Sequence, residues 1–173
     1  GISHVDVGSA TVRLGDDGCY NLILGAADMG TGCDTILAQM AAECLDCPLE
    51  QVAVYGADTD ASPYDSGSYA SSTTYLTGRA VELAKACGEL RENICALAGE
   101  MLGCPPEEAL FQGGRVGRAG TDQFVTLAAV AARSQTSSTR AMEATASHSS
   151  PVSPPPFMVG MAEIELDKAT GQV

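Results

Sequence analysis

Two stretches rich in glycine and hydroxyl side chains have the residue types needed to bind an anion without a basic side chain. Gly30–Gly32 precedes one predicted helix, and Ala70–Thr73 precedes another. A helix N-terminus offers unpaired N–H groups and the positive end of the helix dipole. Glycine allows close approach to the backbone, and hydroxyls add donors without charge. The two stretches therefore predict a site for a phosphate-like group. Asp28 and Asp34 bracket the first stretch and are expected to brace it.

The same residues are also common as ordinary helix caps, so the residues alone leave two interpretations open. In one, the chain is a self-contained binding module that holds a phosphorylated small molecule at two helix N-termini. In the other, it is a structural domain with no ligand. The Gly30-x-Gly32 motif lacks the third glycine of a dinucleotide fingerprint, and no GxxxxGK[ST] segment exists. The common nucleotide-binding motifs are therefore excluded.

The charge of the chain limits the partners it can bind. Its 173 residues carry nine Lys or Arg against 22 Asp or Glu, a formal net charge of −13. Eleven of the acidic residues precede Gly78, where Arg13 is the only base. Such a field repels duplex nucleic acid. It also predicts that a bound anion is held by N–H groups and hydroxyls, not by Lys or Arg.

Several motifs that suggest metal or redox chemistry fail on their context. Cys44 and Cys47 form a CxxC pair, but it ends a predicted helix, and there is no second CxxC. We interpret the seven cysteines as reduced, packed residues of a cytoplasmic protein. The stretch from Asp58 begins like a calcium loop, but Pro63 replaces the turn glycine and Tyr69 the bidentate Glu. No metal site is predicted in this chain.

No acid–base or nucleophilic constellation is apparent either. There is no G-x-S-x-G elbow. His4 lies near the N-terminus and His148 among serines in a flexible stretch, and both are expected to be solvated. Glu163 and Glu165 alternate with apolar residues, which is typical of the outward face of a strand.

The elements that position the two stretches follow from local patterns. Turn residues 15–18 predict a hairpin over 10–24, and alternation predicts a strand over 51–55. Asp34 or Thr35 is the expected N-cap of the first helix. Its predicted buried stripe is Ile36, Leu37, Met40, Ala41 and Cys44. A polar loop over 56–69 leads to the longest predicted helix, which ends near Met101.

The second half is expected to be less regular. A β excursion over 109–117 turns at Gly113-Gly114, and 126–133 is a short helix. Residues 134–156 are typical of a linker, although 139–147 alternate like a strand. Residues 157–167 predict a strand, 167–171 a turn, and Gln172 starts a return strand.

The hairpins, single helices and irregular spacing predict an α+β fold rather than a doubly wound sheet. Hairpins and a short mixed or antiparallel sheet are expected to pack against two main helices. Residues 1–173 are expected to form one domain, because hydrophobic residues make up 45% of the chain. No apolar run reaches the length of a membrane span. The absent initiator methionine and the unfinished final hairpin predict a fragment of a larger subunit.

The ordered set of motifs is similar to one known family. Asp28–Thr35, followed by Gln39 and Glu43, resembles the "E/D-MGQG-x-x-T" segment of the xanthine dehydrogenase/aldehyde oxidase family. The remaining matches follow in family order: Asp58-Thr59, Pro63, Ala70–Thr73, Gly78–Val81, and the "A-E-V-E-V-D-x-x-T-G"-like segment Phe157–Val173. Together they span about Ala10 to Val173.

The resemblance implies that this chain is the front portion of the second of two domains that hold a molybdenum–pyranopterin (molybdopterin) cofactor. It implies these cofactor-binding residues: Met29, Gly30, Thr31, Gly32, Ala70, Ser71 and Thr73. Tyr69 and Ala70 would lie on the substrate side. The sequence departs from the family at Thr31, where Gln is usual, and at Tyr69, where some members have a small residue. Tyr69 would narrow or reshape the substrate pocket.

The resemblance also implies an activity for the parent protein, a molybdenum hydroxylase. This oxidoreductase would hydroxylate an N-heterocycle such as a purine, or an aldehyde, with the cofactor as a mononucleotide or dinucleotide form. The family's catalytic glutamate lies beyond Val173, so this chain would hold no catalytic residue and would be inactive alone. Its partners would be the rest of the large subunit, the small-molecule substrate, and iron–sulfur and flavin (FAD) domains or subunits.

Overall fold

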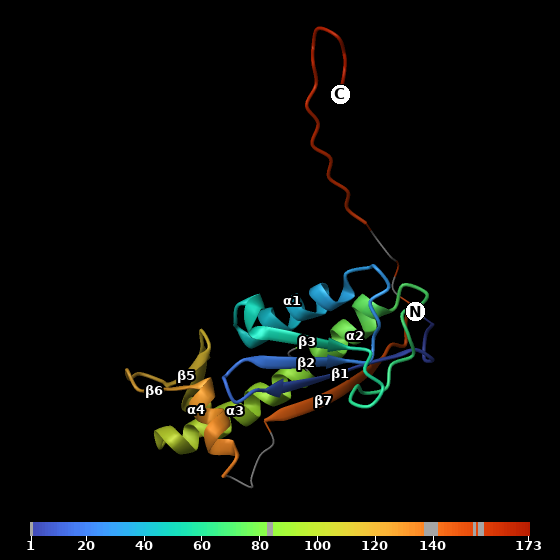
Figure 1. Cartoon of the computed structure of the whole chain (residues 1–173). Helices are drawn as coiled ribbons and strands as arrows, with labels where there is room; N and C mark the ends of the chain where they lie inside the picture. The colour runs from blue at the N-terminus through green and yellow to red at the C-terminus, as the bar shows by residue number, and fades with distance from the viewer. Residues whose placement is uncertain (1, 83–84, 137–141, 154, 156–157) are drawn as a thin grey trace.

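The computed structural model describes residues 2–82, 85–136, 142–153, 155 and 158–173. It has an α+β fold with two sheets, as predicted (Figure 1). The larger sheet has the strand order β3-β2-β1-β7, and the smaller has β4-β5-β6. The strands are β1 (Val7–Leu14), β2 (Tyr20–Leu24), β3 (Val52–Gly56), β4 (Ala109–Gln112), β5 (Arg115–Arg118), β6 (Phe124–Thr126) and β7 (Glu143–Ser149). The helices are α1 (Cys33–Leu45), α2 (Thr73–Val81), α3 (Ala86–Leu102) and α4 (Leu127–Ser134), with short 3-10 turns at Leu49–Gln51 and Pro106–Glu108.

The first hairpin confirms the prediction for residues 10–24. β1 and β2 pair antiparallel, with Ala10 opposite Leu24 and Leu14 opposite Tyr20. The Gly15 N–H closes the loop by donating to the Cys19 carbonyl over 2.7 Å. Alternate residues of both strands point to the helix side of the sheet, where they form the main hydrophobic core.

β2, α1 and β3 form a crossover unit in which β3 pairs parallel to β2. The mixed character of the sheet comes from this pairing. The prediction of Asp34 or Thr35 as N-cap was wrong: Gly32 caps α1 in a left-handed conformation (φ 73°). The buried stripe also differs, because α1 packs on both β3 and α2. Ile36 is 38% exposed, while the buried α1 residues are Cys33, Leu37, Ala38, Ala41, Ala42 and Leu45.

The predicted long helix is two helices, α2 and α3. The backbone leaves helical geometry at Glu82 (ψ 168°) and at Lys85 (φ −138°, ψ −117°). No proline or glycine marks this break. Both helices contact β1, β7 and α1, and α3 also packs against the smaller sheet. Tertiary packing therefore decided where the helix ends.

The stretch expected to be a linker supplies an edge strand. β7 pairs antiparallel with β1 from Val7↔Ser149 to Arg13↔Glu143. On the face away from the helices, the side-chain oxygens of two cross-strand pairs, Ser9–Ser147 and Thr11–Thr145, lie 2.7 Å apart. The alternative prediction of a strand within 139–147 is thus confirmed in part, and its residues 139–141 lie outside the described residues.

The smaller sheet lies at one end of the molecule with α3 and α4 (Figure 1). β4 and β5 pair antiparallel around Gly113 and Gly114, as predicted, whereas β6 was not foreseen. α4 begins where expected, and the Thr126 hydroxyl caps it by accepting from the Ala129 N–H over 3.2 Å.

The strand predicted near the C-terminus does not form within 158–166; residues 156–157 lie outside the described part. This segment extends away from the sheet and its side chains are exposed (Figure 1). The alternation is present, but no strand of the described residues pairs with it, and an unpaired strand is not stable. The expected turn is confirmed by Gly171 N–H donating to the Asp167 carbonyl over 2.7 Å. Among the described residues, no helix is long and apolar enough to cross a membrane.

Candidate functional site

The first turn, between β2 and α1, is organised by one carboxylate oxygen. Asp28 Oδ1 accepts from the backbone N–H groups of Gly30, Thr31 and Gly32, at 2.8, 2.9 and 3.1 Å. Gly30 and Gly32 have positive φ angles of 89° and 73°, which glycine adopts readily. Asp28 therefore braces the turn, as predicted.

The pKa of Asp28 reflects this arrangement. Burial acts to raise the pKa of the carboxyl, but the N–H groups of the turn together hold it below its ordinary value. One of these N–H groups belongs to Asp34, so Asp34 supports the turn with its backbone as well.

The second stretch is positioned by bonds to distant parts of the chain. The Ser68 hydroxyl donates to the Ala27 carbonyl over 2.8 Å, which ties the loop before α2 to the first turn. The Thr77 hydroxyl on α2 donates to Asp65 over 3.0 Å. Gly25, just after β2, lets the loop around Pro63 pack close to its backbone, because a Cβ at Gly25 would lie 2.3 Å from the Pro63 carbonyl oxygen.

The start of α2 has an unusual backbone. Ala70 (φ 49°) and Ser71 (φ 55°) are consecutive non-glycine residues in the left-handed region, which L-residues adopt at a cost. Ser72 precedes the helix without capping it, and its hydroxyl donates to the Tyr69 carbonyl over 2.7 Å. The first-turn N–H groups of α2 have no carbonyl partner within the helix.

Both stretches line one cavity of about 730 Å³, within the range of small-molecule sites. Thr31 of the first stretch and Ser71 of the second therefore lie on the wall of the same cavity. Gly30 and Gly32 belong to the first turn but do not line the cavity. The lining residues are Met29, Thr31, Cys33, Met40, Ser68, Tyr69, Ala70, Ser71, Ser72, Thr73, Thr74, Tyr75, Arg79, Glu82 and Pro155.

A basic residue, Arg79, lines this cavity, although the acidic first part of the chain predicts a site without Lys or Arg. Arg79 lies one residue beyond the acidic stretch on which that expectation was based. Its Nη1 atom lies 2.6 Å from Glu82 Oε2, so the guanidinium is paired, and both residues line the cavity. Arg79 follows Tyr75, which also lines the cavity, by four residues, and this spacing places both on one face of α2.

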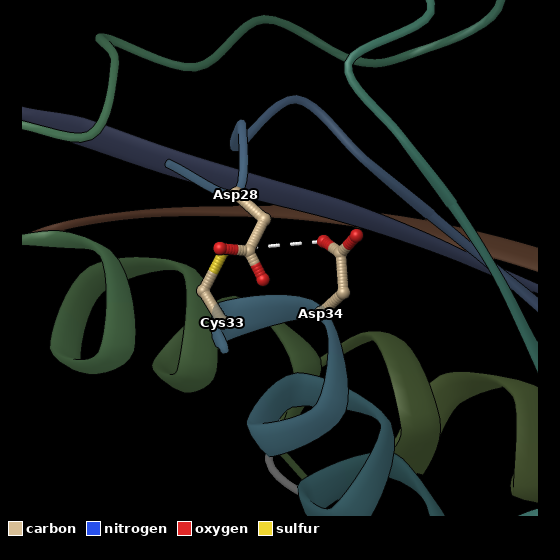
Figure 2. A group of neighbouring side chains, drawn as sticks. All are labelled: Asp28, Cys33 and Asp34. Atoms are coloured by element: carbon tan, nitrogen blue, oxygen red, sulfur yellow. Dashed lines mark hydrogen bonds between the residues drawn. The ribbon is translucent and has the colours of Figure 1, made fainter. Parts of the chain in front are cut away.

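Three side chains gather where α1 begins (Figure 2). The ligand atoms of Asp28, Cys33 and Asp34 lie within 4.8 Å of one another, and the Cys33 thiol donates to Asp34 Oδ1 over 3.9 Å. Asp28 Oδ1 already accepts hydrogen bonds from the N–H groups of Gly30, Thr31 and Gly32. Burial is the main cause that raises the pKa of Cys33 and so keeps its thiol protonated.

The CxxC pair shows the features of packed thiols. Cys44 and Cys47 are half-buried at the end of α1 and form no disulfide. Burial raises the pKa of Cys47 to about 11, which disfavours the reactive thiolate. The interpretation of this pair as packing residues agrees with these observations.

The histidines differ from each other. His4 is exposed, as expected. His148 lies on β7 instead of in a flexible stretch, and its ring meets Tyr75 edge-on with centroids 6.0 Å apart. Its Nε2 atom is buried without a hydrogen-bond partner among the described residues. Burial, followed by nearby Lys85 and Arg79, lowers the pKa of His148, so the imidazole is neutral near pH 7.

The chain is similar in sequence to known molybdenum-enzyme subunits over most of its length. A family model described as a molybdopterin cofactor-binding domain matches residues 1–173. The chain is similar to the probable hypoxanthine oxidase XdhD of Escherichia coli (strain K12), at 33% identity over all of this chain and 18% of that protein. It is also similar to the 6-hydroxypseudooxynicotine dehydrogenase complex subunit gamma of Paenarthrobacter nicotinovorans, at 33% identity over 92% of this chain and 21% of that subunit. The chain thus spans about a fifth of the length of these relatives.

Solved structures share the fold. Quinoline 2-oxidoreductase from Pseudomonas putida 86 matches with a TM-score of 0.70 and 29% identity, over 84% of this chain and 19% of that one. A Cu,Mo-CO dehydrogenase matches with a TM-score of 0.73 and 25% identity, over 83% of this chain and 18% of that one.

Proposed function

Because this chain belongs to the molybdopterin cofactor-binding domain family, we propose that its cavity binds part of a molybdenum–molybdopterin cofactor. The observation that carries the proposal is that the two predicted turns, far apart in sequence, line the same cavity. The parent protein would be a hydroxylase like xanthine dehydrogenase and aldehyde oxidase.

The donors around the cavity suit a pterin with a phosphate. The hydroxyls of Thr31, Ser71 and Thr73 would offer neutral donors to a phosphate, and the N-terminus of α2 would offer the positive end of the helix dipole. Thioether and ring faces of Met29 and Tyr69 offer apolar contacts to a flat heterocycle. The cavity therefore combines an anion-binding end with an apolar wall.

Individual roles follow from this arrangement. Met29 and Thr31 would contact the cofactor from the first turn, where Gly30 and Gly32 supply the tight backbone. From the second stretch, the cofactor-binding residues would be Ala70, Ser71 and Thr73. Tyr69 and Ala70 would face the substrate.

When bound, the molybdenum centre would supply oxygen transfer and two-electron redox chemistry. This chain's residues would bind and orient the cofactor, while the catalytic glutamate would lie beyond Val173. Relatives are named for oxidising hypoxanthine and nicotinate and for aldehyde oxidoreductase activity, which supports an N-heterocycle or aldehyde as substrate.

We further propose the remaining features of the parent protein. Its cofactor would be in mononucleotide or dinucleotide form, with iron–sulfur clusters and FAD in other domains or subunits. The rest of the large subunit would complete the site. The composition of the sequence, with seven cysteines in a chain that has enough apolar residues for a core, is the basis for placing it in a reducing, cytoplasmic location.

Replacing Ser71 with aspartate tests the phosphate site. Asp and Asn both tolerate the left-handed φ of 55° at this position, so Ser71→Asn is a control that differs in charge alone. A carboxylate about 4 Å from a phosphate charge costs about 1–4 kcal/mol, which corresponds to roughly a 5- to 800-fold loss of affinity. Molybdenum and pterin content of the purified parent protein would measure this loss.

We expect Ser71→Asp to lose cofactor and Ser71→Asn to keep most of it. Equal cofactor content in the two variants, with both proteins folded by circular dichroism, would contradict a phosphate at this position.

A further inference from the structure

Tyr69 is anchored to the beginning of the chain by a buried carboxylate. Its hydroxyl donates to Asp6 Oδ1, across 63 residues of sequence. Asp6 is 1% exposed, and its other oxygen accepts from the Ile2 N–H over 2.5 Å. Both carboxylate oxygens are therefore used, one by Tyr69 and one by the N-terminal segment.

The anchor decides where the Tyr69 ring lies. Tyr69 lines the cavity and is 43% exposed, so packing alone holds it weakly. A hydrogen bond to an ionised acceptor is roughly twice as strong as a neutral one. Without it, the ring could rotate about its side-chain bonds toward solvent or over the cavity.

The loop has a second anchor, at Ser66, that does not involve the Tyr69 side chain. The Val7 N–H donates to the Ser66 hydroxyl over 2.7 Å, and the Ser66 N–H donates to the Val7 carbonyl over 2.9 Å. These bonds fix the path of the loop beside β1 but do not touch the Tyr69 ring. The two anchors can therefore be removed separately.

We propose that Asp6 is a positioning residue, which holds the Tyr69 ring at the cavity wall and so sets the width of the opening available to substrate. This inference rests on the proposed function, because the substrate side of the cavity is assigned there. Asp6 itself touches no substrate; it acts through Tyr69.

Spectrophotometric titration of Tyr69 tests the anchor without any cofactor. The chain has five tyrosines, so the absorbance titration of the Tyr69→Phe variant is subtracted from that of the 173-residue chain to isolate the Tyr69 phenol. The hydrogen bond to Asp6 is the main cause that holds the pKa of Tyr69 above its ordinary value. In Asp6→Asn, which keeps the side-chain size, this pKa should fall toward the ordinary value.

The matched control is Ser66→Ala, which should leave the titration of Tyr69 unchanged. An unchanged pKa of Tyr69 in Asp6→Asn would overturn the anchor. So would an equal fall in Ser66→Ala, because the effect would then come from the loop backbone.

Substrate selectivity of the parent enzyme tests the consequence. The ratio of kcat/KM for benzaldehyde to kcat/KM for acetaldehyde should shift by about tenfold in Asp6→Asn. Tyr69→Phe should shift it in the same direction, and adding Asp6→Asn to Tyr69→Phe should shift it no further, because residue 6 acts on the ring only through the Tyr69 hydroxyl. Additive shifts would overturn the positioning role. If Ser71→Asp keeps its cofactor while Asp6→Asn lowers the pKa of Tyr69, the cofactor proposal is contradicted and the Asp6–Tyr69 contact is supported.

Discussion

Replacing Gly8, in β1, with alanine is expected to destabilise the fold. A Cβ at Gly8 would lie 2.4 Å from the Thr77 N atom and 2.6 Å from the Leu76 carbonyl carbon. Both are backbone atoms of α2, so no side chain can rotate to make room. Either α2 moves away from the sheet or the strand shifts.

The cost of such overpacking is about 1–3 kcal/mol and occasionally more. For a chain of this length, each kcal/mol lowers Tm by roughly 2–4 °C. Thermal unfolding of the 173-residue chain, followed by circular dichroism, measures the change. Because α2 carries Thr73 and Arg79, its displacement should also reduce cofactor content in the parent protein.

The matched control is Gly117→Ala in β5. A Cβ there would meet only the Gln123 carbonyl oxygen at 3.5 Å, an ordinary contact. Alanine also loses less conformational entropy on folding than glycine. We therefore expect an unchanged or slightly higher Tm. Equal Tm values for the two variants would contradict the close packing of α2 on β1.

Replacing Asp28 with alanine is expected to lower cofactor binding by about 10- to 100-fold, because a hydrogen bond to a charged group contributes about 1.5–3 kcal/mol. Three N–H groups of the first turn lose their shared acceptor, so the turn that carries Thr31 is no longer held in one conformation. Molybdenum and pterin content of the parent protein would measure the loss. Asp28→Asn keeps one acceptor oxygen and should lose clearly less.

The pH dependence of the turn separates charge from geometry. Since the pKa of Asp28 in the folded chain is lowered, the carboxylate's contribution is fully present above its ordinary value of 3.8 and is lost as pH falls through the lowered pKa. The contribution of this turn to cofactor binding should therefore persist in the parent protein until the pH falls below about 3.8. In Asp28→Asn this acid-dependent step should be absent. A step of the same size in both proteins would show that another group titrates.

Local sequence patterns were sufficient for several elements. The turn residues 15–18 and the alternation beside them predicted the β1–β2 hairpin, and Thr126 marked the start of α4. These signals work because a turn or a cap is decided by a few neighbouring residues. The same patterns also identified Thr31 and Ser71 as residues at helix starts, before any contact between them was known.

Other features could not be predicted because they depend on residues far away in sequence. The break between α2 and α3 has no local signal, since the packing of α2 on β1 and of α3 on the smaller sheet decides it. The segment of β7 resembles a linker in sequence because it is rich in Ser and Thr. Its pairing with the hydroxyls of β1 is visible only in the structure. Conversely, apolar and polar residues alternate over 158–166, but no strand of the described chain lies beside this segment to pair with it.

The candidate site shows the same division. The sequence alone was enough to identify the two turns before α1 and α2, because glycine, hydroxyl and acidic residues shape the backbone next to them. Only the tertiary structure decided that these turns share a cavity, that Arg79 and Glu82 line it, and that Asp6 reaches Tyr69. The physical reason is that strand order and helix packing set these distances, and both depend on burying apolar surface across the whole chain.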